Sequence, residues 1–149
     1  MRPTMADPSL IQILLVEDSL ADIELTLEAL EEAKFVNEVH TMRDGAAAIA
    51  YLRRGNGFED AVRPDLIILD LNLPKRSGHD VLKILKADSE LRRIPVAVLT
   101  TSGAEADVLR SYDLGANCYL TKPVDVGQFM SIVQSIENFW FGVVRLPPR

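Results

Sequence analysis

The feature that most constrains this chain is a short apolar run that ends in a carboxylate, Leu-Ile-Ile-Leu-Asp at residues 66–70. Four apolar residues are too few for a helix, and the run lies between Pro64 and the loop-forming segment 74–78. Such runs are typical of strands buried on both faces, as in parallel sheets. In open α/β sheets the functional site lies at the carboxyl ends of the strands, where Asp70 falls. Alternatively, Asp70 only begins a turn, as aspartates after strands commonly do.

The chain alternates between predicted strands and predicted helices. Strands are predicted from apolar runs, and helices from apolar residues at helical spacing. The predicted strands are 11–16, 38–42, 66–70, 96–100 and 118–121, and the predicted helices are 20–34, 46–53, 78–87, 105–114 and 125–141. Strict alternation predicts a parallel sheet with helices on both faces and right-handed crossovers. Such a chain can adopt the flavodoxin-like α/β fold, a doubly wound (βα)5 sheet with strand order 2-1-3-4-5.

Local signals mark several ends of these elements. Ser19 or Asp22 is expected to cap the first helix, because short polar side chains accept hydrogen bonds from free backbone N–H groups. Gly55 and Gly115 follow the second and fourth helices, where a left-handed residue commonly ends a helix. The strand at 38–42 is less apolar than the others, which favours a place at or near the edge of the sheet.

The length and charge of the chain restrict its class. A length of 149 residues suits one domain, and we expect a disordered lead-in at 1–9, the domain at 10–141 and a C-terminal tail at 142–149. The net charge of −6, without a basic stripe, argues against binding to nucleic acid. No apolar run approaches the roughly 18 residues of a membrane span. A single cysteine allows no disulfide framework, so we expect a cytoplasmic protein.

Polar residues follow the predicted strands at one edge of the sheet. Glu17 and Asp18 follow the first strand, Asp70 ends the third, Thr100 ends the fourth and Lys122 follows the fifth. In the order 2-1-3-4-5 the first and third strands are neighbours, so the three carboxylates are expected to share one crevice. Two charges about 4 Å apart repel by about 4 kcal/mol at an effective dielectric constant of about 20, so such a crevice requires a counter-charge.

The residue types in this crevice indicate a phosphoryl-accepting site. Carboxylate oxygens without histidine or thiolate favour a hard cation, and Mg²⁺ keeps open positions for water and phosphate. Lys122 supplies an ammonium group and Thr100 a hydroxyl. A divalent ion, an ammonium, a hydroxyl and a carboxylate nucleophile together can bind and accept a phosphoryl group.

Several motifs of this sequence resemble those of the receiver domain of two-component response regulators, over nearly all of residues 11–141. The matching segments are Leu15–Asp18, Leu69–Pro74, Gly78, Leu99–Thr101, Gly115–Ala116 and Lys122–Pro123. The resemblance implies that Asp70 takes a phosphoryl group from a sensor histidine kinase, and that the chain is a phosphotransfer acceptor rather than an enzyme. It also implies particular roles for other residues. The Mg²⁺ ligands are Glu17, Asp18, Asp70 and the Asn72 carbonyl. The phosphoryl group is contacted by Asn72, Thr100, the Thr101 amide and Lys122, and a conformational switch involves Thr100 and Tyr119.

The sequence departs from the family pattern at one position, and two other segments resemble one subfamily in particular. Aspartate is frequent in the family where this chain has Glu17, whose longer side chain can reach a metal through water. The loop at 55–64, with its length and the Tyr51–Arg54 segment that leads into it, resembles that of stand-alone receivers that partner phytochrome-type kinases, and so does Asn138–Trp140.

The sequence also predicts how the signal leaves the domain. The chain stops soon after the fifth helix, so we expect the readout to be a protein surface formed by 105–114, 118–121 and 125–141. We expect a homodimer through this face and the aromatic residues at 139–141, because exposed apolar patches mark interfaces. Alternatively, the tail folds back over its own domain.

Two other functions compete with that of a phosphoacceptor. An aspartyl-phosphate hydrolase would use the same nucleophile, but haloacid-dehalogenase-like phosphatases usually carry Asp-x-Asp after the first strand, whereas this chain has Asp70-Leu71-Asn72 after the third. A degenerate receiver acting as a binding module is the other alternative. The presence of the full set, Asp18, Asp70, Thr100 and Lys122, argues against it.

Overall fold

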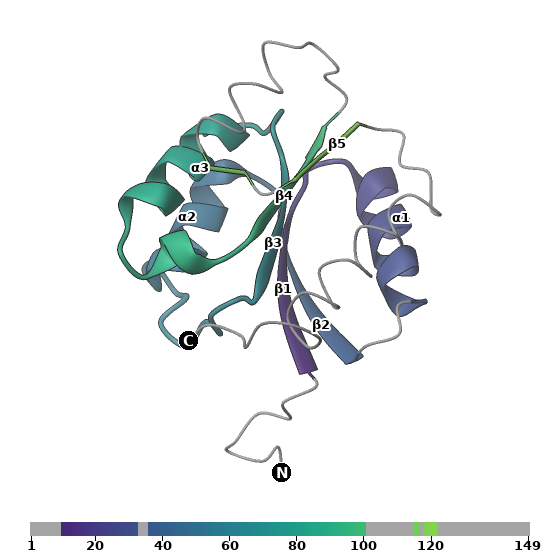
Figure 1. Cartoon of the computed structure of the whole chain (residues 1–149), viewed down its shortest axis with the longest axis horizontal. Helices are drawn as coiled ribbons and strands as arrows, with labels where there is room; N and C mark the ends of the chain where they lie inside the picture. Colours follow the sequence, from purple (N-terminus) through teal and green to yellow (C-terminus); the bar gives the residue numbers. More distant parts are fainter. Residues whose placement is uncertain (1–9, 33–35, 101–114, 117, 122–149) are drawn as a thin grey trace.

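The computed structural model describes residues 10–32, 36–100, 115–116 and 118–121, which contain a five-stranded parallel sheet in the order β2-β1-β3-β4-β5 (Figure 1). The strands are β1 (Leu10–Val16), β2 (Val36–Met42), β3 (Leu66–Asp70), β4 (Val96–Thr100) and β5 (Cys118–Thr121). The helices are α1 (Leu20–Glu31), α2 (Gly45–Arg53), α3 (Gly78–Ala87) and the short 3₁₀ helix η1 (Leu91–Arg93). The flavodoxin-like fold and the strand order predicted from the sequence are confirmed, and β2 lies at an edge of the sheet.

Several sequence predictions fall outside the described residues. They concern the lead-in at 1–9, the helices at 105–114 and 125–141, the tail at 142–149, Thr101 and Lys122. In the described ranges, no helix combines the length and the apolar character that crossing a lipid bilayer requires.

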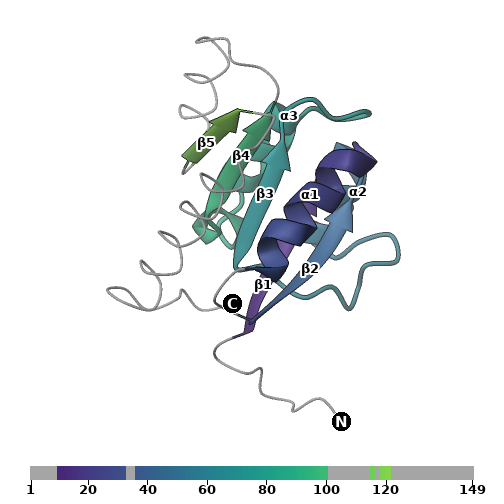
Figure 2. The ribbon, with the colours of Figure 1, turned by 90° about the vertical axis from the view of Figure 1, so that its right-hand side faces the viewer.

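The sheet is covered on both faces, by α1 on one side and by α2 and α3 on the other (Figures 1 and 2). Alternate residues of β1 point to opposite faces and belong to two separate hydrophobic clusters. Leu14 and Val16 pack on the side of α2 and α3, whereas Ile13 and Leu15 pack on the side of α1. All four side chains are completely buried, which explains why this strand is a continuous apolar run rather than an alternating one.

Helices α1 and α3 begin at the predicted residues, and α2 begins one residue earlier, at Gly45; polar side chains cap each of the three. The Ser19 hydroxyl accepts a hydrogen bond from the Asp22 backbone N–H at 3.3 Å, so Ser19 is the cap of α1. The Asp44 carboxylate accepts one from the Ala47 N–H at 2.7 Å at the start of α2. Each cap satisfies a donor that the first helical turn would otherwise leave without a partner.

The end of α2 differs from the prediction. Arg54, not Gly55, adopts the left-handed conformation, with φ of 57°. The Gly55 N–H then donates to the Ala50 carbonyl at 2.9 Å and closes the helix. The Arg54 side chain donates through Nε to the Ala61 carbonyl at 3.0 Å, so a contact with the following loop helps to hold a conformation that is unfavourable for a residue with a Cβ atom.

Candidate functional site

Three carboxylates meet at the carboxyl edge of the sheet. Val16 pairs with Leu69 across β1 and β3, so the next residues, Glu17 and Asp70, lie side by side. Carboxylate oxygens of Glu17, Asp18 and Asp70 all lie within 4.8 Å of one another. The convergence expected from the strand order is therefore present in the structure.

Two of the three acidic side chains are buried. Glu17 has no exposed surface and Asp70 is 4% exposed, while Asp18 reaches solvent. Backbone donors satisfy part of the buried oxygens: Ser19 N–H donates to Glu17 Oε2 at 3.2 Å, and Asn72 N–H donates to Asp70 Oδ1 at 3.0 Å. Burying carboxylates costs free energy unless they are hydrogen-bonded or paired with positive charge, so this cluster suits an oxygen-seeking cation.

The loop between β3 and α3 folds tightly around Asp70. The Gly78 N–H donates to the Leu71 carbonyl at 3.0 Å, which brings the start of α3 against the end of β3. A Cβ atom on Gly78 would collide with the Asp70 carbonyl oxygen and would lie 2.5 Å from the Leu71 Cα. Only glycine fits there, and its close approach fixes the backbone that carries the Asp70 carboxylate.

The same loop contacts the start of α2. Gly45 N–H donates to the Pro74 carbonyl at 3.3 Å, and Lys75 Nζ lies 3.6 Å from Asp44 Oδ2. A Cβ atom on Gly45 would collide with the Arg76 carbonyl oxygen. The loops that follow β2 and β3 are thus packed backbone to backbone beside the acidic cluster.

The remaining predicted site residues are placed by the backbone alone or lie outside the described part. Asp70 pairs with Leu99, and Thr100 pairs with Thr121, so the backbone of Thr100 ends β4 at the same edge as Asp70. Tyr119 pairs with Val98 in β5. Asn72, two residues after Asp70 in the chain, is exposed to solvent. Thr101 and Lys122 lie outside the described residues.

Arg43 contacts the acidic cluster, although the sequence reasoning did not single it out. Its Nη2 donates to the backbone carbonyl of Asp18 at 2.8 Å. Its position in the sequence indicates this role, because Arg43 directly follows β2 and so falls at the same edge of the sheet as Glu17 and Asp70.

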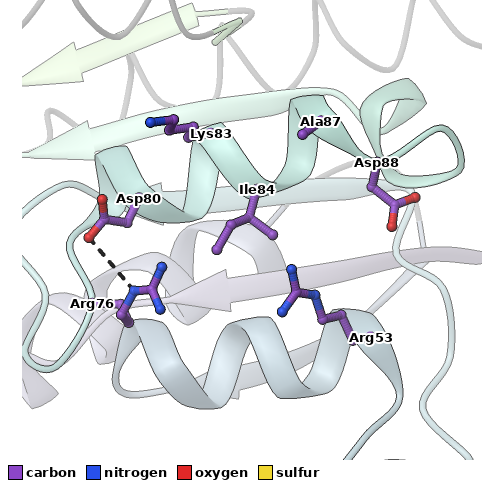
Figure 3. A pocket seen from close by; sticks show the side chains of 7 residues that line it. All are labelled: Arg53, Arg76, Asp80, Lys83, Ile84, Ala87 and Asp88. Atoms are coloured by element: carbon purple, nitrogen blue, oxygen red, sulfur yellow. Dashed lines mark ion pairs between the residues drawn. The ribbon is translucent and has the colours of Figure 1, made fainter.

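A second concave region lies between α2 and α3 and is separate from the acidic cluster (Figure 3). This open groove has a volume of about 450 Å³. Its lining residues are Arg53, Arg76, Asp80, Lys83, Ile84, Ala87 and Asp88. Arg76 Nε lies 3.7 Å from Asp80 Oδ2, a half-exposed ion pair of the kind that contributes little to stability. The groove has no buried, convergent polar groups among these residues, so the acidic cluster is the better candidate site.

Comparison with known proteins identifies the family of this chain. Residues 13–134 match the family model of the response regulator receiver domain. The chain is 50% identical over 135 residues to the response regulator Rcp1 of Synechocystis, covering 91% of this chain and 92% of that protein. It is 42% identical over 135 residues to the probable methanogenesis regulatory protein FilR2 of Methanothrix harundinacea, covering 91% and 86%.

Solved structures of response regulators also match this chain. The phosphorylated cyanobacterial phytochrome response regulator RcpA superposes with a TM-score of 0.81 at 51% identity, covering 93% of this chain and 99% of that one. The Mn²⁺-bound form of Rcp1 superposes with a TM-score of 0.80 at 48% identity, with the same coverage. With the sheet order, the acidic cluster and these matches in agreement, the chain belongs to the receiver domain family of two-component response regulators.

Proposed function

We propose that this receiver domain accepts a phosphoryl group on Asp70 from the phosphohistidine of a sensor kinase. The observation that carries the proposal is the convergence of Glu17, Asp18 and Asp70 within 4.8 Å at the carboxyl edge of the sheet. Of these three, Asp70 ends the central strand β3, and the following loop folds tightly around it. A buried, backbone-held carboxylate is a nucleophile with a fixed direction of attack.

The proposed step is a transfer between two nucleophiles. A carboxylate oxygen of Asp70 forms a bond to phosphorus while the bond from phosphorus to the histidine nitrogen breaks. The imidazole leaves with the electron pair of that bond and takes up a proton, and Asp70 becomes an acyl phosphate. Catalysis of such a transfer rests on positioning and on charge stabilisation, since the protein itself contributes little other chemistry.

The donor set fits a hard divalent cation, which we propose to be Mg²⁺. The cluster offers oxygen ligands from Glu17, Asp18 and Asp70, without histidine or cysteine among its members. The carbonyl of Asn72 is the fourth proposed ligand. When bound, the ion supplies positive charge that offsets the charge of the phosphoryl oxygens. Rcp1, a relative of this chain, has been crystallised with Mn²⁺, which supports a divalent ion in this family.

We further propose that Thr100, the Thr101 amide and Lys122 receive the transferred group. Thr100 ends β4, which lies directly beside β3, so its backbone is at the edge where Asp70 ends. Thr121, which pairs with Thr100, immediately precedes Lys122. Tyr119 lies diagonally across the β4–β5 pair from Thr100, a placement that supports the proposed switch between the two positions.

The kinase is proposed to be of the phytochrome type, acting in the cytoplasm. The support is similarity: RcpA, at 51% identity, is described as a cyanobacterial phytochrome response regulator.

We also propose that the chain forms a homodimer through 105–114, β5 and 125–141, including the aromatic residues at 139–141. Light scattering should show a mass of two chains at high concentration. A mass of one chain, with and without phosphorylation, would contradict the dimer.

Transfer from a labelled kinase tests the proposed function. A purified phytochrome-type kinase is phosphorylated on its histidine with radiolabelled ATP, freed of nucleotide and mixed with this protein. Label should move to this chain in Mg²⁺ and remain on the kinase in EDTA. A histidine kinase of another sensor class, mixed under the same conditions, should transfer label much more slowly.

The same preparation separates the proposed acceptor from a hydrolase. An acceptor takes up at most one phosphoryl group per site and loses it slowly, whereas a hydrolase turns over a substrate such as p-nitrophenyl phosphate many times per chain. Many turnovers would support the hydrolase. Failure of both the kinase and acetyl phosphate to label the chain would contradict the acceptor function.

A further inference from the structure

The loop that carries Asp18 is held by hydrogen bonds at successive residues. Glu17 N–H donates to the Met42 carbonyl of β2 at 3.0 Å. Ser19 N–H donates to Glu17 Oε2 at 3.2 Å, and the Ser19 carbonyl accepts the first bond of α1 from Ile23 N–H at 2.9 Å. Between these anchors, the carbonyl of Asp18 accepts a 2.8 Å hydrogen bond from Arg43 Nη2.

The hydrogen bond from Arg43 is made to Asp18, the most exposed member of the acidic cluster. Glu17 and Asp70 are buried, and packing restricts their side chains. Asp18 is the one of the three that reaches solvent, so its direction depends more on the hydrogen bonds of its own backbone. A guanidinium group keeps a planar, preorganised set of donors and stays charged at all ordinary pH values, which makes it suited to holding a carbonyl in place.

We propose that Arg43 is a positioning residue for the cation site: by holding the Asp18 backbone, it directs the Asp18 carboxylate toward Glu17 and Asp70. This inference rests on the proposed function, because it assumes that the three carboxylates bind a divalent ion. Arg43 itself is not a ligand, since a guanidinium group has no acceptor atom.

The charge of Arg43 acts in the opposite direction from its hydrogen bond. A positive group beside a cation site repels the cation, so an effect of charge alone would make binding tighter when Arg43 is removed. That gain is limited to a few fold for an exposed group, and salt screens it. Loss of a hydrogen bond that orients a ligand typically weakens metal binding by about 10-fold or more. Removal of Arg43 should therefore weaken cation binding if Arg43 positions Asp18, and should tighten it if only the charge of Arg43 matters.

Metal titration of three variants tests the inference. Arg43→Gln removes both the charge and the reach of the donor, while Arg43→Lys keeps the charge and a donor group at the end of a long side chain. Arg54→Gln is the matched control, because Arg54 is also exposed and also donates to a backbone carbonyl, that of Ala61 at 3.0 Å, in another part of the chain. Free Mn²⁺ is measured by electron paramagnetic resonance, and Mg²⁺ binding by calorimetry, each at low and at high salt.

We expect Arg43→Gln to weaken Mn²⁺ and Mg²⁺ binding by about 10-fold at both salt concentrations. Arg43→Lys should recover part of this loss, and Arg54→Gln should bind like the wild type. With Mg²⁺ raised far above its weakened dissociation constant, Arg43→Gln should regain the wild-type rate of labelling by acetyl phosphate. That recovery is a result of restored occupancy, which a general loss of structure would not produce.

Other results would overturn the inference. Equal or tighter cation binding by Arg43→Gln would show that Arg43 does not position Asp18, while leaving the proposed cation site intact. An equal loss in Arg54→Gln would show that the effect is not specific to the site. A wild-type protein that binds neither ion would overturn the proposed cation site and this inference with it.

Discussion

Replacing Asp70 by asparagine is expected to reduce phosphoryl transfer to this chain to background. The amide has nearly the same shape as the carboxylate, but its oxygen is a far weaker nucleophile and carries no charge for a cation. Asn72 N–H donates to Asp70 Oδ1 at 3.0 Å, and the amide oxygen of asparagine can accept the same bond, so the fold should persist. Label from the phosphorylated kinase, followed by gel electrophoresis and by the mass of the intact protein, measures the loss.

Asp65→Asn is the matched control for this substitution. Asp65 is also buried, at 7% exposure, and its Oδ2 accepts a hydrogen bond from the Gln12 N–H at 2.9 Å. It precedes β3, at the opposite end of the strand from Asp70, so Asp65→Asn should accept label like the wild type. Full labelling of Asp70→Asn would place the acceptor on another residue and would contradict the proposed role of Asp70.

Gly78→Ala is expected to lower both stability and phosphoryl acceptance. The new Cβ atom would collide with the Asp70 carbonyl oxygen and would lie 2.5 Å from the Leu71 Cα, both of which are backbone atoms that cannot rotate away. Such overpacking costs about 1–3 kcal/mol, which exceeds the gain of up to about 1 kcal/mol that alanine offers over glycine in a helix. Because the end of β3 or the start of α3 must shift, the Asp70 carboxylate moves, and a displacement of about 1 Å can slow a reaction about 100-fold.

Urea unfolding measures the stability of this variant, and the initial rate of labelling by acetyl phosphate measures its activity. Gly55→Ala is the control, because Gly55 lacks a left-handed φ and a Cβ atom added to it would meet open space, with no atom beyond its chain neighbours within 4 Å. It should change neither quantity beyond about 0.5 kcal/mol and twofold, as is usual for surface substitutions. Wild-type stability and labelling in Gly78→Ala would show that the loop around Asp70 adjusts without cost.

The sequence predicted the elements of this fold well where local chemistry decides them. The runs at 66–70, 96–100 and 118–121 are strands with the predicted bounds, because an apolar run between turn residues has few alternatives. The helix at 78–87 also has its predicted bounds. The strand predicted at 38–42 begins earlier, at Val36, since pairing with β1 extends it beyond what its own composition indicates.

Contacts between an element and the loop or strand beside it decided the features that the sequence did not predict. Arg54 takes the left-handed position at the end of α2, next to a glycine that would adopt it at less cost, and its side chain is bound to the Ala61 carbonyl. Gly78 belongs to one of the motifs shared with the receiver family, but the reason for glycine there is the Asp70 carbonyl that lies against it.

The sequence by itself determined the order of the described strands and helices, the cap of the first helix, and which polar residues end at the carboxyl edge of the sheet. These features follow from residue-by-residue preferences and from the few ways in which alternating strands and helices can be connected. Only the tertiary structure decided that Glu17 and Asp70 are buried while Asp18 is not, and that Arg43 holds the Asp18 backbone. Burial and hydrogen-bond geometry depend on how segments far apart in the chain pack together, and neighbouring residues do not encode that packing.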